Sequence, residues 1–390
     1  QGPGALAVRD ACRDLMLAQG FEVGEIPYPL RKLEKTAAYD QAIAADIKAR
    51  GYDWMDNRGS AIQLHNETGF HDKPINVAKA VMYSMMPAGS VLKVPDSLWQ
   101  SYVYASLLAG SAQRGCKVMI IAPTLDSAPS DAPPTLARAH GLLGRLIVFS
   151  NAMDDLLDKE GGLLKVGLYA PRQGVGDIAG RFEQAFNTTP EWVRRIYPPN
   201  PHVEVRAPEV AAILDSLGYE VQYLSDEEED ITPKIHLKAN FMASGTAWQK
   251  LLVRPEFNEI MTGYVEYLAD QSGEAGTNLE GPDVKTFPPR LKDGWTRLFR
   301  GMISDLSPSE KEENIFYFTV GSTNMDYRSM VMDGEVQVTL GGWQSLYGFL
   351  DFLMLPGLCE WVETTEELDA LLPPPSGMVR AMAGLMKLTL

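Results

Sequence analysis

The chain has 390 residues, 45% of them hydrophobic, and a formal net charge of −16 at pH 7. This length and composition allow a large core in one or two domains. The negative charge repels phosphate backbones at long range, so nucleic acid is not favoured as a partner. The three cysteines, Cys12, Cys116 and Cys359, are odd in number and widely spaced, which indicates neither a disulfide framework nor a metal-knuckle site. We therefore expect no metal and no cofactor.

The apolar stretches are shorter than the roughly 20 residues that a membrane-spanning helix needs. The N-terminal stretch QGPGALAVRD lacks the basic region and apolar run of a secretory signal. We expect a soluble protein, either cytoplasmic or secreted after removal of a signal, and the compartment stays open.

Residues 1–75 indicate a helical lead-in. Helical patterns run from Leu6 to Gln19 and from Tyr39 to Arg50, on either side of the proline-containing turn EIPYPL. This region is expected to be a linker from an upstream half of a longer protein, or the remnant of such a half.

Helices and strands alternate from residue 76 onward. A helix is expected at 76–85, a short strand within AGSVLKVPDSLW, and a helix within SYVYASLLAGSAQRG that ends at Gly115. The next stretch, CKVMIIAP, is a continuous apolar run, which is typical of a parallel strand covered on both faces. Helical spacing returns at 210–217, and the alternating stretch YEVQYL predicts another strand.

Three further strands are expected, in ITPKIHLKANFM, NIFYFTVGSTNMD and GEVQVTLGG. The alternation predicts an α/β fold. Large helical or loop insertions are expected at about 124–207 and 246–313, and a helical segment at 346–390. The final stretch MVRAMAGLMKLTL is expected to form an amphipathic helix that packs on the core or touches a membrane surface transiently.

Two polar motifs carry the candidate chemistry. On a strand, His236 and Lys238 are two residues apart, so their side chains lie on the same face. The later strand ends with Gly321, Ser322 and Asn324, which offer a close approach, a hydroxyl and an amide donor. Side chains of these types would converge on a tetrahedral phosphoryl group without a metal.

An H-x-K strand followed by G-S-x-N-x-D-x-R-S and a downstream acid resembles the phospholipase D superfamily. The second motif is carried here by six residues, and Glu335 stands at the acid position. They are Gly321, Ser322, Asn324, Asp326, Arg328 and Ser329. The resemblance covers 76–345, which it predicts to be a phospholipase D-like catalytic domain with a mixed sheet flanked by helices.

The resemblance implies a metal-independent phosphodiester exchange through a phosphohistidine. His236 would be one of two catalytic histidines, and whether it attacks phosphorus or protonates the leaving alcohol stays open. Lys238 and Asn324 would bind the non-bridging oxygens, with Gly321 allowing the substrate to approach. Ser322 would assist, and Glu335 would fix the tautomer of the histidine.

The sequence departs from the family pattern in two ways. Ala243 occupies the position of the aspartate in HxKxxxxD, and only one complete motif copy is present. The other H-x-K, His71-Asp72-Lys73, has no G-S-x-N strand behind it. The second half of the site would therefore come from an upstream half or from a second chain, or it has degenerated.

The leading prediction for the substrate is a glycerophospholipid, which is hydrolysed or undergoes transphosphatidylation. The alternatives are a nucleic-acid phosphodiesterase of the same superfamily and a catalytically weakened module that binds phosphate or lipid. Four large apolar residues could shape an apolar groove or lid for a lipid, or pack in the core. They are Trp248, Met261, Trp295 and Met302.

Overall fold

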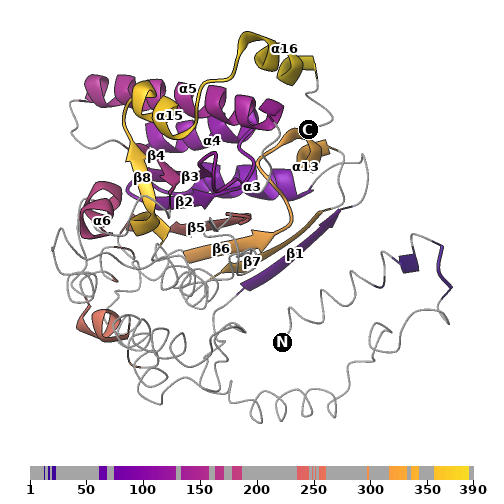
Figure 1. Ribbon diagram of the computed structural model, residues 1–390. Coiled ribbons are helices and arrows are strands. Elements are labelled where there is room, and N and C mark those ends of the chain that lie inside the picture. The colour runs from indigo at the N-terminus through magenta and orange to yellow at the C-terminus, as the bar shows by residue number, and fades with distance from the viewer. Residues whose placement is uncertain are drawn as a thin grey trace, which may run out of the picture.

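The computed structural model describes about half of the chain, in ten segments and a few single positions (Figure 1). The segments are 61–67, 74–128, 133–157, 163–170, 178–186, 235–245, 254–260, 316–331, 335–341 and 355–385.

Within these segments the chain forms one sheet of eight strands in the order β1-β7-β6-β5-β2-β3-β4-β8. Strands β2, β3 and β4 are parallel, and every other neighbouring pair is antiparallel. The strands are β1 Ala61–Glu67, β2 Val91–Pro95, β3 Lys117–Pro123, β4 Leu164–Tyr169, β5 Ala239–Ala243, β6 Phe316–Gly321, β7 Glu335–Gly341 and β8 Cys359–Val362. This mixed sheet with flanking helices confirms the predicted α/β class.

Helices cover both faces of the sheet, and α3, α4 and α5 lie together on one of them (Figure 1). The longest is α5, which runs over 25 residues. The helices are α3 Pro74–Met85, α4 Tyr102–Gln113, α5 Pro133–Leu157, α6 Ile178–Phe186, α13 Tyr327–Val331, α15 Thr365–Leu371 and α16 Gly377–Leu385, with a 3-10 helix η3 Leu355–Leu358. None of the helices in the described segments is long and apolar enough to cross a bilayer.

Local sequence explains where the first helices begin and end. Pro74 opens α3, a position that suits proline because the first helical N–H needs no partner within the helix. Ser101 caps α4 by accepting a hydrogen bond from the backbone N–H of Tyr104. Gly115 follows α4 with a φ of 95°, so the expected stop at this glycine is confirmed.

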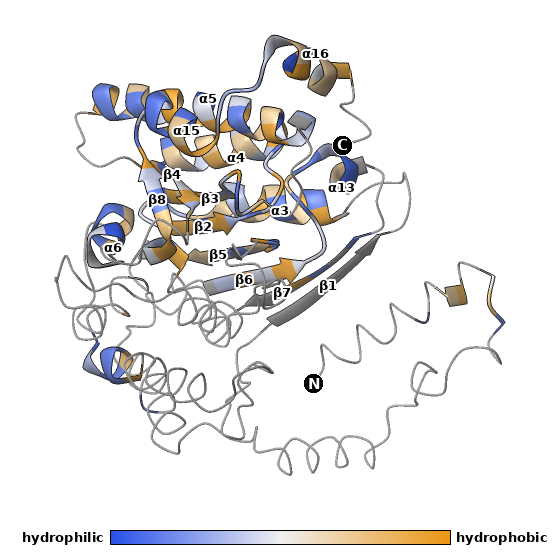
Figure 2. Ribbon diagram, viewed as in Figure 1, coloured by the Kyte–Doolittle hydropathy of each residue, from blue (hydrophilic) through white to orange (hydrophobic). Residues whose placement is uncertain are grey.

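The main core lies between the sheet and helices α3, α4 and α5. Leu92, Ile120 and Leu168 of the parallel strands are fully buried there, as is Leu143 of α5. Figure 2 shows β2 and β3 as predominantly apolar strands. The continuous apolar run at β3 therefore forms a parallel strand buried on both faces, as predicted.

The opposite face has a second buried layer that contains charged groups. Met242 of β5 belongs to the main core, so the adjacent Phe241 points to the other face, where its ring lies 6.0 Å from that of Trp248. Trp248 also packs on Phe186 of α6. Of its two expected roles, Trp248 thus has the one in core packing.

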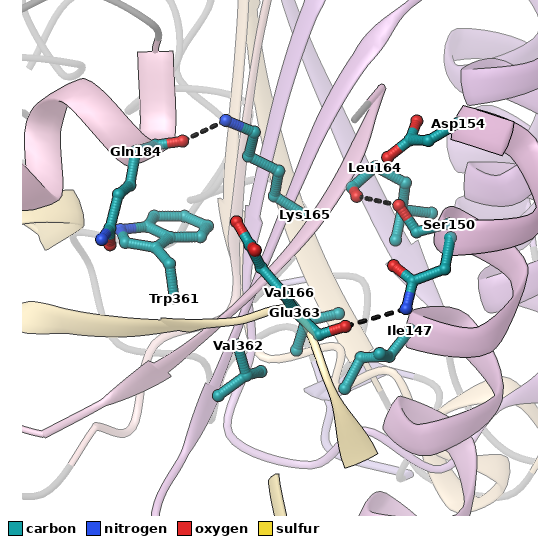
Figure 3. A pocket seen from close by; sticks show the side chains of 11 residues that line it. Ile147, Ser150, Asp154, Leu164, Lys165, Val166, Gln184, Trp361, Val362 and Glu363 are labelled. Atoms are coloured by element: carbon teal, nitrogen blue, oxygen red, sulfur yellow. Dashed lines mark hydrogen bonds between the residues drawn. The ribbon is translucent and has the colours of Figure 1, made fainter. Parts of the chain in front are cut away.

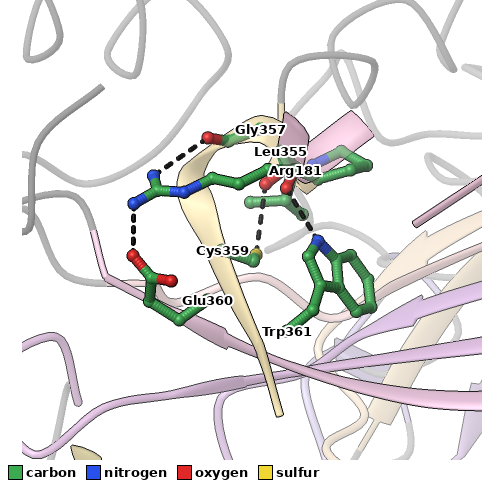
Figure 4. A network of polar contacts seen from close by, with 7 residues as sticks. Arg181, Leu355, Gly357, Cys359, Glu360 and Trp361 are labelled. Carbon is green, nitrogen blue, oxygen red and sulfur yellow. Dashed lines mark hydrogen bonds and ion pairs between the residues drawn. The ribbon is translucent and has the colours of Figure 1, made fainter. Parts of the chain in front are cut away.

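Lys93 of β2 is buried in the sheet, and burial lowers the pKa of its ammonium group to about 7. Burial also raises the pKa of the Cys359 thiol to about 12. Nearby, the Arg181 side chain of α6 pairs with Glu360 and donates to the carbonyl of Gly357 (Figure 4). This contact fastens β8 and η3 to α6.

The structure differs from the expected insertion at 124–207. Part of that segment is core, because β4 pairs with β3 on one side and β8 on the other. Gly167 interrupts the apolar run of β4, and a Cβ atom there would come within 3.1 Å of the Trp361 ring. The glycine that makes the strand look weak in the sequence is therefore needed for packing.

The ends of the chain also contribute to the sheet. β1 comes from the expected helical lead-in and pairs with β7, while β8 comes from the expected C-terminal helical segment. Three other expectations lie outside the described residues: the strand YEVQYL, the helix at 210–217 and the second H-x-K. So does most of 246–313, including Met261, Trp295 and Met302.

α16 packs on α5. Ala383 is buried there, and its carbonyl accepts a hydrogen bond of 2.8 Å from Nε of Arg138. The opposite side of the helix carries the exposed apolar side chains of Met378, Met382 and Leu385. α16 is thus held on the protein by one face and presents the other to solvent.

Two glycines cross closely at the far end of β5. A Cβ atom on Gly245 would lie 2.3 Å from the carbonyl oxygen of Gly89, which itself has a φ of 83°. Gly89 also donates a hydrogen bond of 2.8 Å to the carbonyl of Gly115. The contact between Gly89 and Gly245 therefore holds the turn before β2 against the segment that follows β5.

Candidate active site

The predicted site residues meet at one edge of the sheet, the side on which strands β2, β5, β6 and β7 begin or end. The antiparallel pairing brings the end of β2 beside the start of β5, with a bridge between Asp96 and Lys238. The end of β6 lies next to them, because the N–H of Gly321 donates to the carbonyl of Lys238 at 3.2 Å. β7 begins at Glu335 on the other side of β6.

Lys238 and Asn324 are linked through a third residue, Ser97. The Lys238 ammonium group donates to Oγ of Ser97 at 3.4 Å, and Ser97 donates to Oδ1 of Asn324 at 3.0 Å. The motif residues are far apart in the sequence, and the segment after β2 joins them. The ammonium and carboxamide groups can both bind phosphate oxygens.

His236 is exposed and lies just before β5. The expectation that the whole H-x-K motif is strand is wrong, since only Lys238 forms a bridge and β5 starts one residue later. Lys238 folds back toward the histidine and donates to its backbone carbonyl at 3.4 Å. Chain proximity and this contact keep the two residues together without a regular strand.

Ser322 and Glu335 form a second pair at the same edge. The exposed Ser322 hydroxyl donates to Oε2 of the buried Glu335. The carboxylate thus orients the serine hydroxyl. The expected role of Glu335 in fixing the tautomer of His236 stays a prediction.

The remaining motif residues build the loop that carries Asn324. The buried Asp326 accepts a hydrogen bond of 2.8 Å from the backbone N–H of Ser329, at the start of α13. Oγ of Ser329 in turn accepts from the backbone N–H of Asn324 at 3.1 Å. Arg328 is exposed on α13. Asp326 and Ser329 therefore hold the backbone of the loop.

Ala243, at the position of the family aspartate, lies at the opposite end of β5 from Lys238. It is buried and pairs with Val91 and Phe316. Five residues of extended chain separate it from Lys238, or roughly 17 Å. A carboxylate at this position would therefore lie far from the Lys238 ammonium group.

Beneath the site lies a buried carboxylate that the sequence analysis missed. Asp96 is 1% exposed and accepts a hydrogen bond of 2.8 Å from the N–H of Leu98. Burial raises its pKa to about 7, against the opposing effect of the Lys79 and Lys238 ammonium groups. Lys79, also buried, donates to the carbonyl of Thr323 at 3.2 Å. Together these groups place one titratable carboxyl group and two ammonium groups close to the predicted site residues.

Among the described residues, no cluster of histidine, cysteine and acidic side chains could hold a metal ion. A pocket of about 130 Å³ lies at the other edge of the sheet, between α5, β4 and β8 (Figure 3). It contains none of the predicted site residues. Its polar side chains include Ser150, Asn151, Asp154, Lys165 and Glu363.

Comparison with known proteins gives distant likenesses among solved structures. The sequence matches no family model, and no curated protein is significantly similar to it. Among solved structures, phosphatidylserine synthase from Haemophilus influenzae Rd KW20 is similar over 93% of this chain, with a TM-score of 0.41 and 11% sequence identity. The match spans 57% of that synthase chain. A likeness this distant assigns neither a family nor an activity, so the function is inferred from the site.

Proposed function

We propose that the protein is a phospholipase D-like phosphodiesterase that hydrolyses glycerophospholipids or transfers their phosphatidyl group. The observation that carries the proposal is the hydrogen-bonded series from Lys238 through Ser97 to Asn324, with His236 beside it. A cation and an amide joined in this way, with a histidine two residues from the cation, support the proposal. This is the set of groups that a metal-independent phosphoryl transfer uses.

In the proposed reaction, Lys238 and Asn324 bind the non-bridging oxygens and stabilise the charge that builds up on them. A histidine nitrogen forms a bond to phosphorus, and the bond from phosphorus to the headgroup oxygen breaks. A second histidine gives its proton to that oxygen. Water or another alcohol then gives a proton back to the second histidine and attacks phosphorus, which breaks the P–N bond and frees the first histidine.

The reaction requires two histidines, and His236 supplies one of them. We propose that the other comes from an upstream half of the protein or from a second chain. His236 and Ser322 are both exposed, which supports access by another polypeptide from that side. Whether His236 is the nucleophile or the acid is decided by the experiment below.

The test compares His236→Ala with His140→Ala. His140 lies on α5, belongs to neither motif and bonds to Asp369 at 2.7 Å, so it controls for loss of a histidine. Headgroup release from short-chain phosphatidylcholine is measured with EDTA present. We expect His236→Ala to lower the rate by about 10²–10⁴-fold, the range for loss of an acid–base group, and His140→Ala to leave it unchanged.

Intact mass after rapid mixing and an alkaline quench, which preserves P–N bonds, assigns the role. A phosphatidyl adduct lost in His236→Ala makes His236 the nucleophile, and an adduct that persists in the variant makes it the acid. Equal rates in wild type and His236→Ala would overturn the proposal. Phosphate binding without turnover would instead favour a binding module, and cleavage of oligonucleotides alone would favour a nuclease.

Contact with a lipid surface forms part of the same proposal. The exposed side chains of Met378, Met382 and Leu385 follow one another at helical spacing on the outer side of α16. An apolar stripe of this kind supports shallow insertion into the headgroup region of a membrane. It gives the protein a means of staying near its substrate.

A further inference from the structure

Ser97 belongs to neither sequence motif, yet it lies between two motif residues. It is 3% exposed and follows directly on Asp96, whose N–H donates to the carbonyl of Ile121 at 3.0 Å. Two residues later, the buried Trp99 donates from Nε1 to the same carbonyl at 2.9 Å. Ser97 is therefore fixed between two anchored neighbours at the end of β2.

The chemistry of lysine sets the direction of the hydrogen bonds through Ser97. A charged ammonium group has donors and no acceptor, so the serine oxygen must accept from Lys238. The single hydroxyl proton is given to Oδ1 of Asn324. The carboxamide oxygen is thus used on the protein side, and the amino group of Asn324 faces away from Ser97.

The backbone of Asn324 is held by other contacts. Its N–H donates to Ser329, and the carbonyl of the next residue, Met325, accepts from the N–H groups of Gln100 and Ser101 at 2.9 and 2.8 Å. Loss of the Ser97 hydroxyl would leave the loop in place and free the terminal amide torsion. It would also remove one acceptor from Lys238, which keeps its bond to the carbonyl of His236. An amide turned by about 180° would present its oxygen to the substrate, and two acceptors repel each other.

We propose that Ser97 is a positioning residue that orients the carboxamide of Asn324 so that its amino group, and not its oxygen, meets a phosphate oxygen. The inference rests on the proposed function, because it assigns the open side of Asn324 to phosphate. It also makes the charge of Lys238 and the orientation of Asn324 two parts of one anion-binding unit.

The test uses Ser97→Ala, Ser97→Thr and the control Ser150→Ala. Ser150 is a buried serine on α5 that donates to the carbonyl of Leu164 in the other polar cluster. Affinity for inorganic phosphate is measured by calorimetry, with kcat and KM for headgroup release. We expect Ser97→Ala to weaken phosphate binding by about 10-fold, the size of one hydrogen bond to a charged group. Ser97→Thr should retain wild-type affinity, and Ser150→Ala should change neither quantity.

A double-mutant cycle separates positioning from general damage. If Ser97 acts through Asn324, Ser97→Ala should have no further effect in the Asn324→Ala background. Full additivity, or a Ser97→Ala variant that binds phosphate like the wild type, would overturn the inference while His236-dependent turnover leaves the proposed function standing. A wild-type protein that neither binds phosphate nor turns over would overturn both.

Discussion

Two polar clusters lie at opposite edges of the same sheet, and their hydrogen bonds differ in kind. In the cluster between α5, β4 and β8, side chains are bonded to backbone carbonyls: Ser150 to Leu164, Asn151 to Glu363, and Lys165 to Gln184 (Figure 3). At the site edge, Lys238, Ser97 and Asn324 are bonded to one another.

This difference distinguishes a cluster that holds elements of the fold together from one that can bind a ligand. A side chain that donates to a carbonyl of another element ties two elements together. Side chains that orient one another keep donors for a ligand, because each hydroxyl or amide has more than one hydrogen-bonding position. The pocket at the far edge is therefore a structural joint despite its volume, and the site edge is where we expect chemistry.

The largest difference between the clusters should come from their lysines. Lys238→Met removes the cation that contacts Ser97, and we expect headgroup release to fall by about 10²–10³-fold, as for loss of one preorganised transition-state donor. Lys165→Met removes a tie to Gln184 and should leave the rate unchanged. Steady-state rates at saturating substrate are the measurement, and similar losses in both variants would erase the distinction between the clusters.

The two asparagines sharpen the comparison. Asn324→Ala should lower kcat by about 10²-fold, because a donor to the phosphate is lost. Asn151→Ala removes a bond of 2.9 Å to the carbonyl of Glu363 and should lower the free energy of unfolding by only about 1 kcal/mol, with no change in kcat. Urea unfolding and kinetics on the same samples test both. A catalytic defect in Asn151→Ala would make the far pocket part of the site.

The smallest expected effect concerns the two carboxylates, Asp96 and Asp154. Burial raises the pKa of both, to about 7 for Asp96. Between pH 4 and 7 the folded protein therefore keeps a proton on Asp96 that the unfolded chain has released. The free energy of unfolding then falls as pH rises through this window, by at most about 1.4 kcal/mol per pH unit for one proton.

Asp96→Asn should remove this contribution, so its stability should fall less steeply than that of the wild type between pH 4 and 7. Asp154→Asn should change the slope in the same direction and less, since Asp154 is only half-buried. Urea midpoints measured across the window give the slopes. A wild-type slope in Asp96→Asn would mean that the neighbouring ammonium groups keep Asp96 ionised.

Much of the main core could be predicted from local sequence. The apolar run of β3, the helix ending at Gly115 and the strand before Gly321 each carry their pattern within a few residues. β4 was missed because Gly167 breaks its pattern, and the reason for that glycine is the distant Trp361. The contact between Gly167 and Trp361 is a tertiary contact, which cannot be predicted from a local sequence pattern.

The site residues also fall into those that could be predicted from the sequence and those that could not. Lys238, Ser322 and Asn324 could be singled out from motif spacing, because one motif precedes the start of a strand and the other follows the end of one. Ser97 and Asp96 could not, since VPDSLW has no distinctive spacing and the partners of Ser97 lie 141 residues or more away. The usable clue was that polar residues directly follow a buried strand, at the edge where binding residues of α/β sheets gather.

The crossing of Gly245 and Gly89 has a consequence for mutagenesis of this protein. Any side chain at position 245 meets a backbone oxygen, which has no rotamer to change. A saturation library selected for activity should therefore keep glycine at this position as strictly as it keeps His236. The two positions would look alike in such a screen, although one is held by a steric limit and the other by a reaction.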